Sequence, residues 1–191
     1  MSTFTCPAPL RALALATALA LGAAASASAA TERFEIGFSN IYSVGLLDDP
    51  DNTTLSFDIG RQSFVVGFDF DVQLTAFDPS WLDEMTLKVS NDIGEGFTFR
   101  PIFDLSAPGT ASASGSFDLL NAGLAFSTRR SGTLNLEFFE FWDDFAGQAD
   151  GRWDRGTLGV IYAPIPEPAT LAMFAAGVAV VVGRRRLGSR R

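Results

Sequence analysis

Carboxylates are the side chains best able to do chemistry in this sequence, because it contains no histidine and one cysteine. They are densest between Glu137 and Asp154, where four aspartates fall in a loop-like stretch: Asp143, Asp144, Asp150 and Asp154. Carboxylate oxygens at this density suit Ca²⁺, which takes about six to eight oxygen ligands. The spacing differs from that of an EF-hand loop. The four aspartates are therefore candidate calcium ligands, and a merely solvated acidic surface is the alternative.

Two tryptophans flank the acidic stretch, Trp142 and Trp153. Indole rings can stack on sugar rings, so both are candidate ligand-stacking residues, and a carbohydrate site would coincide with the calcium site. Packing in a core or at a sheet edge is the alternative, since tryptophan buries a large apolar surface.

The composition excludes several kinds of catalysis. A Ser-His-Asp or Cys-His site needs an imidazole base, and zinc sites of the usual type need His or Cys ligands. The sequence has no histidine, and its single cysteine, Cys6, precedes an N-terminal apolar stretch. A glycosidase needs only two positioned carboxylates, so a small carboxylate-dependent hydrolase stays a third alternative. Abundant carboxylates do not indicate a pair, and we expect no enzyme.

Residues 1–30 have the features of a secretory signal peptide. An apolar stretch runs from Ala12 to Ala25, and small residues follow it as far as Ala30. This order predicts export and cleavage after Ala29 or Ala30. An uncleaved N-terminal anchor is the alternative.

The C-terminal residues 165–191 have three parts in a fixed order. Pro166, Glu167 and Pro168 come first, an uncharged apolar run spans 169–183, and a basic cluster fills 184–191, beginning with Arg184, Arg185 and Arg186. The apolar run is shorter than the roughly 20 residues that span a bilayer comfortably, but thinning of the bilayer and snorkelling arginines let a short helix insert. The arginines should stay cytoplasmic. The prolines keep the backbone extended, as a protease requires.

In order, spacing and terminal position these tail residues resemble the PEP-CTERM sorting signal of Gram-negative bacteria. In that family an exosortase, a membrane protease, processes the exported protein near Pro-Glu-Pro, and the carriers tend to be surface or extracellular-matrix components. The resemblance implies that the exosortase and the secretion machinery are partners. It also implies an inner-membrane intermediate, then delivery to the cell envelope or beyond, in an exopolysaccharide or biofilm setting. A permanent C-terminal anchor is the alternative.

The remaining body, residues 31–164, is long enough for one domain. From Thr31 to Pro168 the chain has 22 acidic and 8 basic residues, a net charge of −14. This charge disfavours nucleic acid and anionic lipid as partners.

Alternation of apolar and polar residues predicts strands throughout the body. The clearest run has the apolar residues Phe64, Val66, Phe68, Phe70, Val72 and Leu74. Shorter runs lie at 34–38, 54–59, 85–90, 97–99, 134–139 and 158–162, with turn-forming sequences between them. We therefore predict an all-β fold, an antiparallel β-sandwich or jelly roll of seven to nine strands whose core is filled by the body's phenylalanines. Residues 107–116 should be a loop or weak edge strand, and 79–84 a short helical turn.

Segments of the body also resemble the P domain that accompanies subtilisin-like proprotein convertases, a jelly-roll sandwich. The matching segments are 81–89, 131–136, the acidic residues with Gly147, and 156–158. Leu134 stands where that family usually has tryptophan. The resemblance supports the fold and implies no catalytic residue. The sequence as a whole predicts an exported structural or adhesive protein, with a calcium- or carbohydrate-binding module as the alternative.

Overall fold

The computed structural model describes residues 30–164 and residue 177. Four predicted segments lie outside the described residues: the signal peptide up to Ala29, the motif 166–168, the apolar span 169–183 other than Gly177, and the basic cluster 184–191. Within the described part of the chain, no helix has the length and apolar character needed to cross a membrane. Residues 30–164 belong to one compact unit.

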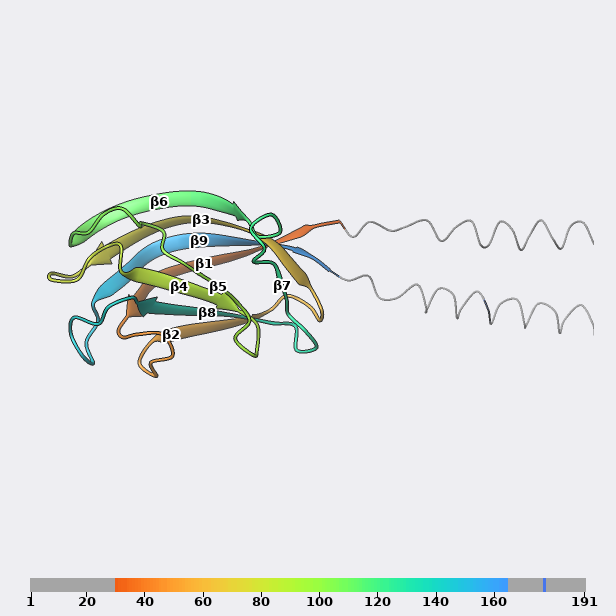
Figure 1. The fold of residues 1–191 in the computed structure, drawn as a ribbon, viewed down its shortest axis with the longest axis horizontal. Helices are drawn as coiled ribbons and strands as arrows, with labels where there is room; N and C mark the ends of the chain where they lie inside the picture. Colours follow the sequence, from red (N-terminus) through yellow and green to blue (C-terminus); the bar gives the residue numbers. More distant parts are fainter. Residues whose placement is uncertain (1–29, 165–176, 178–191) are drawn as a thin grey trace, which may run out of the picture. The chain divides into compact units, whose positions relative to one another are not determined.

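This body is all-β, with nine strands in two antiparallel sheets, as predicted (Figure 1). The strands are β1 (Glu32–Ser43), β2 (Thr53–Asp58), β3 (Phe64–Ala76), β4 (Met85–Ser90), β5 (Gly96–Phe99), β6 (Gly109–Asp118), β7 (Phe126–Ser127), β8 (Thr133–Glu140) and β9 (Gly151–Ala163). The larger sheet has the order β1-β9-β3-β6, and β7 pairs with one end of β3. The smaller sheet has the order β2-β8-β4-β5.

The core lies between the two sheets and follows the alternation of the sequence. In β8, Leu134, Leu136 and Phe138 are fully buried and the residues between Leu134 and Phe138 are only partly so. In β4 the inward row is Met85, Leu87 and Val89. Each fully buried side chain of this size contributes about 1.5–3 kcal/mol of burial free energy.

The alternation in β3 is confirmed from Phe68 onward and is wrong before it. Phe64 is exposed and Val66 only partly buried, whereas Val65 is fully buried. The pairing of β3 with β9 shifts register between Val65 and Gly67. A bulge of this kind exchanges the two faces of a strand, because side chains alternate with a period of two.

Three smaller expectations have mixed outcomes. Residues 107–116 lie largely in β6, an edge strand. The segment 79–84 forms a hydrogen-bonded turn, in which the amide of Glu84 donates to the carbonyl of Trp81 at 3.1 Å, and it does not become a helix. The phenylalanines do not all fill the core, since five are exposed: Phe64, Phe103, Phe117, Phe141 and Phe145.

The two ends of the body leave from the same end of the sandwich. Strands β1 and β9 are antiparallel neighbours along their whole length, from the pair Glu32–Tyr162 to the pair Ser43–Gly151. The loops 44–52 and 141–150 therefore lie together at the opposite end (Figure 1), which we call the loop end.

Candidate functional site

The predicted calcium ligands are divided between the acidic loop, residues 141–150, and β9. Asp143 and Asp144 are exposed in the loop, whereas Asp150 is fully buried at its base. The Oδ2 atom of Asp150 accepts a hydrogen bond from the Asp144 amide at 2.8 Å. Asp150 thus stabilises the conformation of the acidic loop through this hydrogen bond.

Asp154 is committed to other partners on β9. Its carboxylate forms an ion pair with Arg152 and accepts a hydrogen bond from the Thr75 hydroxyl at 2.6 Å. Across residues 30–164 no group of three or more acidic, histidine or cysteine side chains is placed to hold a metal ion. The structure therefore does not bring the four aspartates together as one set of ligands.

The two candidate stacking tryptophans have opposite environments. Trp142 is 63% exposed and makes an edge-to-face contact with the exposed Phe141, with ring centroids 5.7 Å apart. Trp153 is fully buried in the core, where it makes edge-to-face contacts with Phe38 and Phe138. The two rings therefore do not form one stacking surface: of the two only Trp142 is exposed, because strand alternation turns Trp153 inward.

A buried carboxyl group lies in the core at the loop end. Glu140, the last residue of β8, is fully buried and accepts a hydrogen bond from the Ser43 hydroxyl. Burial, together with the nearby carboxylates of Asp150 and Glu84, raises the pKa of Glu140 to about 8. Burial also raises the pKa of Asp150 and of Glu84.

A groove of about 610 Å³ crosses the outer face of the smaller sheet toward the loop end. Its lining residues are Leu46, Leu47, Thr86, Thr98, Phe99, Arg100, Phe139, Glu140 and Phe141. The Arg100 guanidinium lies 5.1 Å from the centre of the Phe141 ring, in a cation–π contact. Aromatic walls with hydroxyl and guanidinium groups suit a ligand that has both apolar faces and hydroxyl groups, as a sugar does.

The sequence reasoning missed this groove, although one signal was present. In β8 the residues between the inward positions should be polar, yet Phe139 is apolar. An apolar residue on the outward face of a strand indicates a surface that is used or covered.

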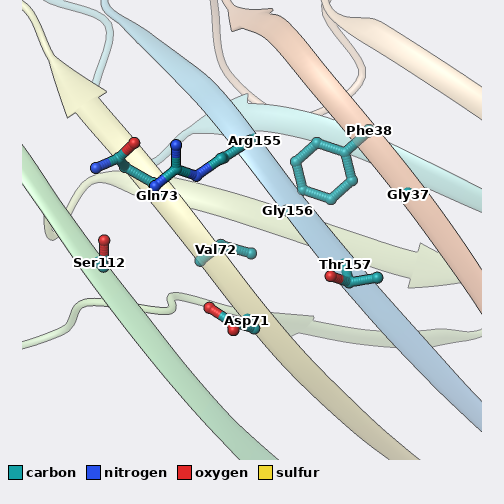
Figure 2. Close-up of a pocket in the computed structure, with 9 residues that line it drawn as sticks. All are labelled: Gly37, Phe38, Asp71, Val72, Gln73, Ser112, Arg155, Gly156 and Thr157. Carbon is teal, nitrogen blue, oxygen red and sulfur yellow. The ribbon is translucent and has the colours of Figure 1, made fainter.

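A second hollow, of about 340 Å³, lies on the larger sheet (Figure 2). Polar residues from three adjacent strands line it: Asp71 and Gln73 of β3, Arg155 and Thr157 of β9, and Ser112 of β6. Gln73 and Arg155 are directly opposite each other in the β3–β9 register, so their side chains share one row. This hollow offers hydrogen bonds but no aromatic ring other than Phe38.

The body is therefore an all-β sandwich with a ligand-sized aromatic groove. Residues 164–186 match the PEP-CTERM protein-sorting motif. The chain accordingly carries the sorting signal of an exported protein that is handled by a membrane-anchored exosortase. No curated protein matches the chain.

Solved structures give only distant similarities to the body. The crystal structure of a serine protease of Aeromonas sobria is 12% identical, with a TM-score of 0.41, over 77% of this chain and 30% of that one. Dimeric latent PorU from Porphyromonas gingivalis is 14% identical, with a TM-score of 0.39, over 74% of this chain and 14% of that one. The chain thus spans less than a third of the length of either protein, and the P-domain resemblance stays a prediction.

Proposed function

We propose that this protein is a non-enzymatic structural or adhesive component of the cell surface or extracellular matrix, in an exopolysaccharide or biofilm setting. The observation that carries the proposal is the PEP-CTERM motif at residues 164–186. The acidic body and the exposed aromatic residues at the loop end also support it, since both are compatible with contact to matrix polymers outside the cell.

In this proposal the protein acts through its placement. The signal peptide exports the chain, and the apolar run 169–183 holds it in the inner membrane with Arg184, Arg185 and Arg186 on the cytoplasmic side. Processing at Pro166-Glu167-Pro168 then passes the body onward.

The intact mass of the protein recovered from its native host tests this pathway. We expect a species that begins at Ala30 or Thr31 and ends near residues 166–168. The matched control is a variant with Pro166, Glu167 and Pro168 replaced by alanine, which should keep the tail. A parent protein that still contains 169–191 would show that the tail is a permanent anchor and would overturn the proposed release.

A carbohydrate-binding module is the second candidate function, favoured by the groove beside the exposed rings of Phe141 and Trp142. Retention of the purified protein on polysaccharide from the host matrix tests it. Trp142→Ala should lower retention at least about tenfold, the loss expected when an aromatic anchor is truncated. The control is Ile93→Ala, because Ile93 is equally exposed, at 63%, and lies in the β4–β5 turn at the far end of β4. Equal retention of both variants would exclude Trp142 from the site.

A further inference from the structure

Strand β6 is an open edge of the larger sheet. It has ten residues, Gly109–Asp118, and within the described part of the chain it pairs only with β3. Its other side therefore presents a row of backbone N–H and C=O groups. Such a row is a template for pairing with another strand.

Strand β6 has few of the features that normally protect an edge, and its one charged residue, Asp118, is its last. Natural edge strands carry lysine, proline, inward charges or bulges, or are very short. From Gly109 to Phe117 there is no charged residue and no proline, and the register with β3 runs without a shift. The other edges differ: β1 carries Glu32, Arg33 and Glu35, and β2 and β5 have six and four residues.

Large exposed apolar residues flank β6 in the sequence. Phe103, 73% exposed, and Leu105 precede the strand, and Phe117, Leu120 and Leu124 occupy its end or follow it. Suppose that β6 pairs with β6 of a second copy in an antiparallel, two-fold arrangement. The residues that follow β6 in one copy then lie beside the residues that precede β6 in the other copy. The apolar residues at the two ends would then cover one another.

The apolar residues at both ends of β6 favour a second copy as the occupant, because a two-fold pairing places each apolar end against the other. The body has a net charge of −14 from Thr31 to Pro168, so two copies repel each other over most of their surfaces. Residues Gly109 to Phe117 carry no charge, so the pairing places no like charges opposite each other there. We propose that the protein self-associates through β6, which joins two larger sheets into one continuous antiparallel sheet.

Cysteine cross-linking tests the pairing in the full-length chain exported by its host. The outward row of β6 provides four positions: Thr110, Ser112, Ser114 and Ser116. Each is changed to cysteine in a Cys6→Ser background, with Ser39→Cys on β1 as a control that is also exposed and lies on the opposite edge. In a two-fold antiparallel pair, a residue lies opposite the same residue of the second copy only at the position where the symmetry axis passes. We expect disulfide-linked dimer at one or two neighbouring positions, several-fold above Ser39→Cys, and a decline on either side.

A charge placed beside the cross-link separates specific pairing from random collision. Ser112→Lys, added to the variant that cross-links best (or Ser114→Lys where that position is 112), should lower the dimer yield several-fold, because it places two like charges close to the two-fold axis of a pairing that otherwise has none there. Ser39→Lys in the same background should leave the yield unchanged. A cross-linking profile no higher than that of Ser39→Cys, or a peak that is insensitive to the added lysine, would overturn the proposal.

Discussion

The hydroxyl of Ser43, at the end of β1, donates a hydrogen bond to the carboxyl group of Glu140, at the end of β8, and both side chains are fully buried. The contact joins the larger sheet to the smaller one at the loop end. The second carboxyl oxygen of Glu140 has no hydrogen-bond partner among the described residues. A buried carboxyl group is costly when it is ionised, because burial removes most of the solvation of its charge.

The stability of the body should fall as the pH rises. The pKa of Glu140 is raised from 4.5 to about 8, so between these values the folded state holds a proton that the unfolded state has lost. Each pKa unit corresponds to about 1.4 kcal/mol, so the total loss should be on the order of 5 kcal/mol, complete above about pH 8. The raised pKa values of Asp150 and Glu84 act in the same direction. Urea unfolding at several pH values from 5 to 9 measures the effect.

Glu140→Gln is the matched variant for that experiment. Glutamine keeps the shape and the acceptor for Ser43 but has no proton to lose. We expect the variant to lie within about 1 kcal/mol of the parent at pH 5 and to exceed it at pH 9. The same pH slope in both proteins would show that Glu140 is not the group responsible.

The two tryptophans should respond oppositely to truncation. Trp153→Ala should lower the free energy of unfolding by about 3–5 kcal/mol, because it empties a fully buried site between Phe38 and Phe138. Trp142→Ala should change it by less than about 0.5 kcal/mol, since the side chain is exposed. Trp153→Phe should cost less than Trp153→Ala, because the indole N–H of Trp153 has no partner among the described residues. Denaturant unfolding of the three variants measures these changes in the free energy of unfolding. An unchanged free energy of unfolding in Trp153→Ala would contradict the core position of Trp153.

Gly159 should be sensitive to a single added methyl group. The Arg33 side chain of β1 crosses over this residue of β9 to reach Asp69 of β3, with its Nη2 atom 2.7 Å from Oδ1. A Cβ atom at position 159 would collide with both partners. Because the ion pair is partly exposed, Gly159→Ala should lower the free energy of unfolding by no more than about 1 kcal/mol.

Gly37→Ala is the control for that change, since a Cβ atom there meets nothing within 4 Å. In an Arg33→Ala background the cost of Gly159→Ala should be smaller, because one of the two obstructing side chains is gone and Asp69 is no longer held by the ion pair. Thermal or urea unfolding of the four proteins measures the coupling, and an equal cost in both backgrounds would assign the effect to the backbone instead.

Calcium should leave the thermal midpoint of the body unchanged to within about one degree at about 1 mM, the range in which extracellular modules bind the ion. The reason is that Asp154 is engaged by Arg152 and Thr75, so the four aspartates do not converge. A clear rise in the midpoint that EDTA reverses would show that the acidic loop rearranges around the ion.

Local alternation was sufficient to predict the all-β fold and most strands of this body. Leu134, Leu136 and Phe138 face inward because a strand that has one buried face must alternate. The same rule failed at Phe64, since a bulge depends on the neighbouring strand and leaves no period in the sequence. For residues 107–116 the small polar composition left a loop or a weak edge strand as the two predictions, and the structure has most of them in an edge strand.

The candidate site was less predictable because it is assembled from distant parts of the chain. Trp142 and Trp153 look equivalent in the sequence, and only the start of β9 between them decides that Trp153 is buried. Glu140 looks like one more acidic residue beside the loop. Its raised pKa arises from burial and from the carboxylates of Asp150 and Glu84, and the hydrogen bond from Ser43, 97 positions away, only partly offsets it. No local pattern reports such enclosure.

The pairing of Glu32 with Tyr162 puts the entry and exit of the chain side by side, and the Tyr162 hydroxyl donates to the Glu32 carboxylate at 2.8 Å. Strand β9 then runs 13 residues, roughly 40 Å at about 3.3 Å per residue, from the acidic loop to this point. Attachment of the body through either of its termini is therefore attachment at the end of the sandwich opposite the loop end. If one terminus is cut, or if attachment passes from one terminus to the other, the acidic loop and the aromatic groove stay at the unattached end.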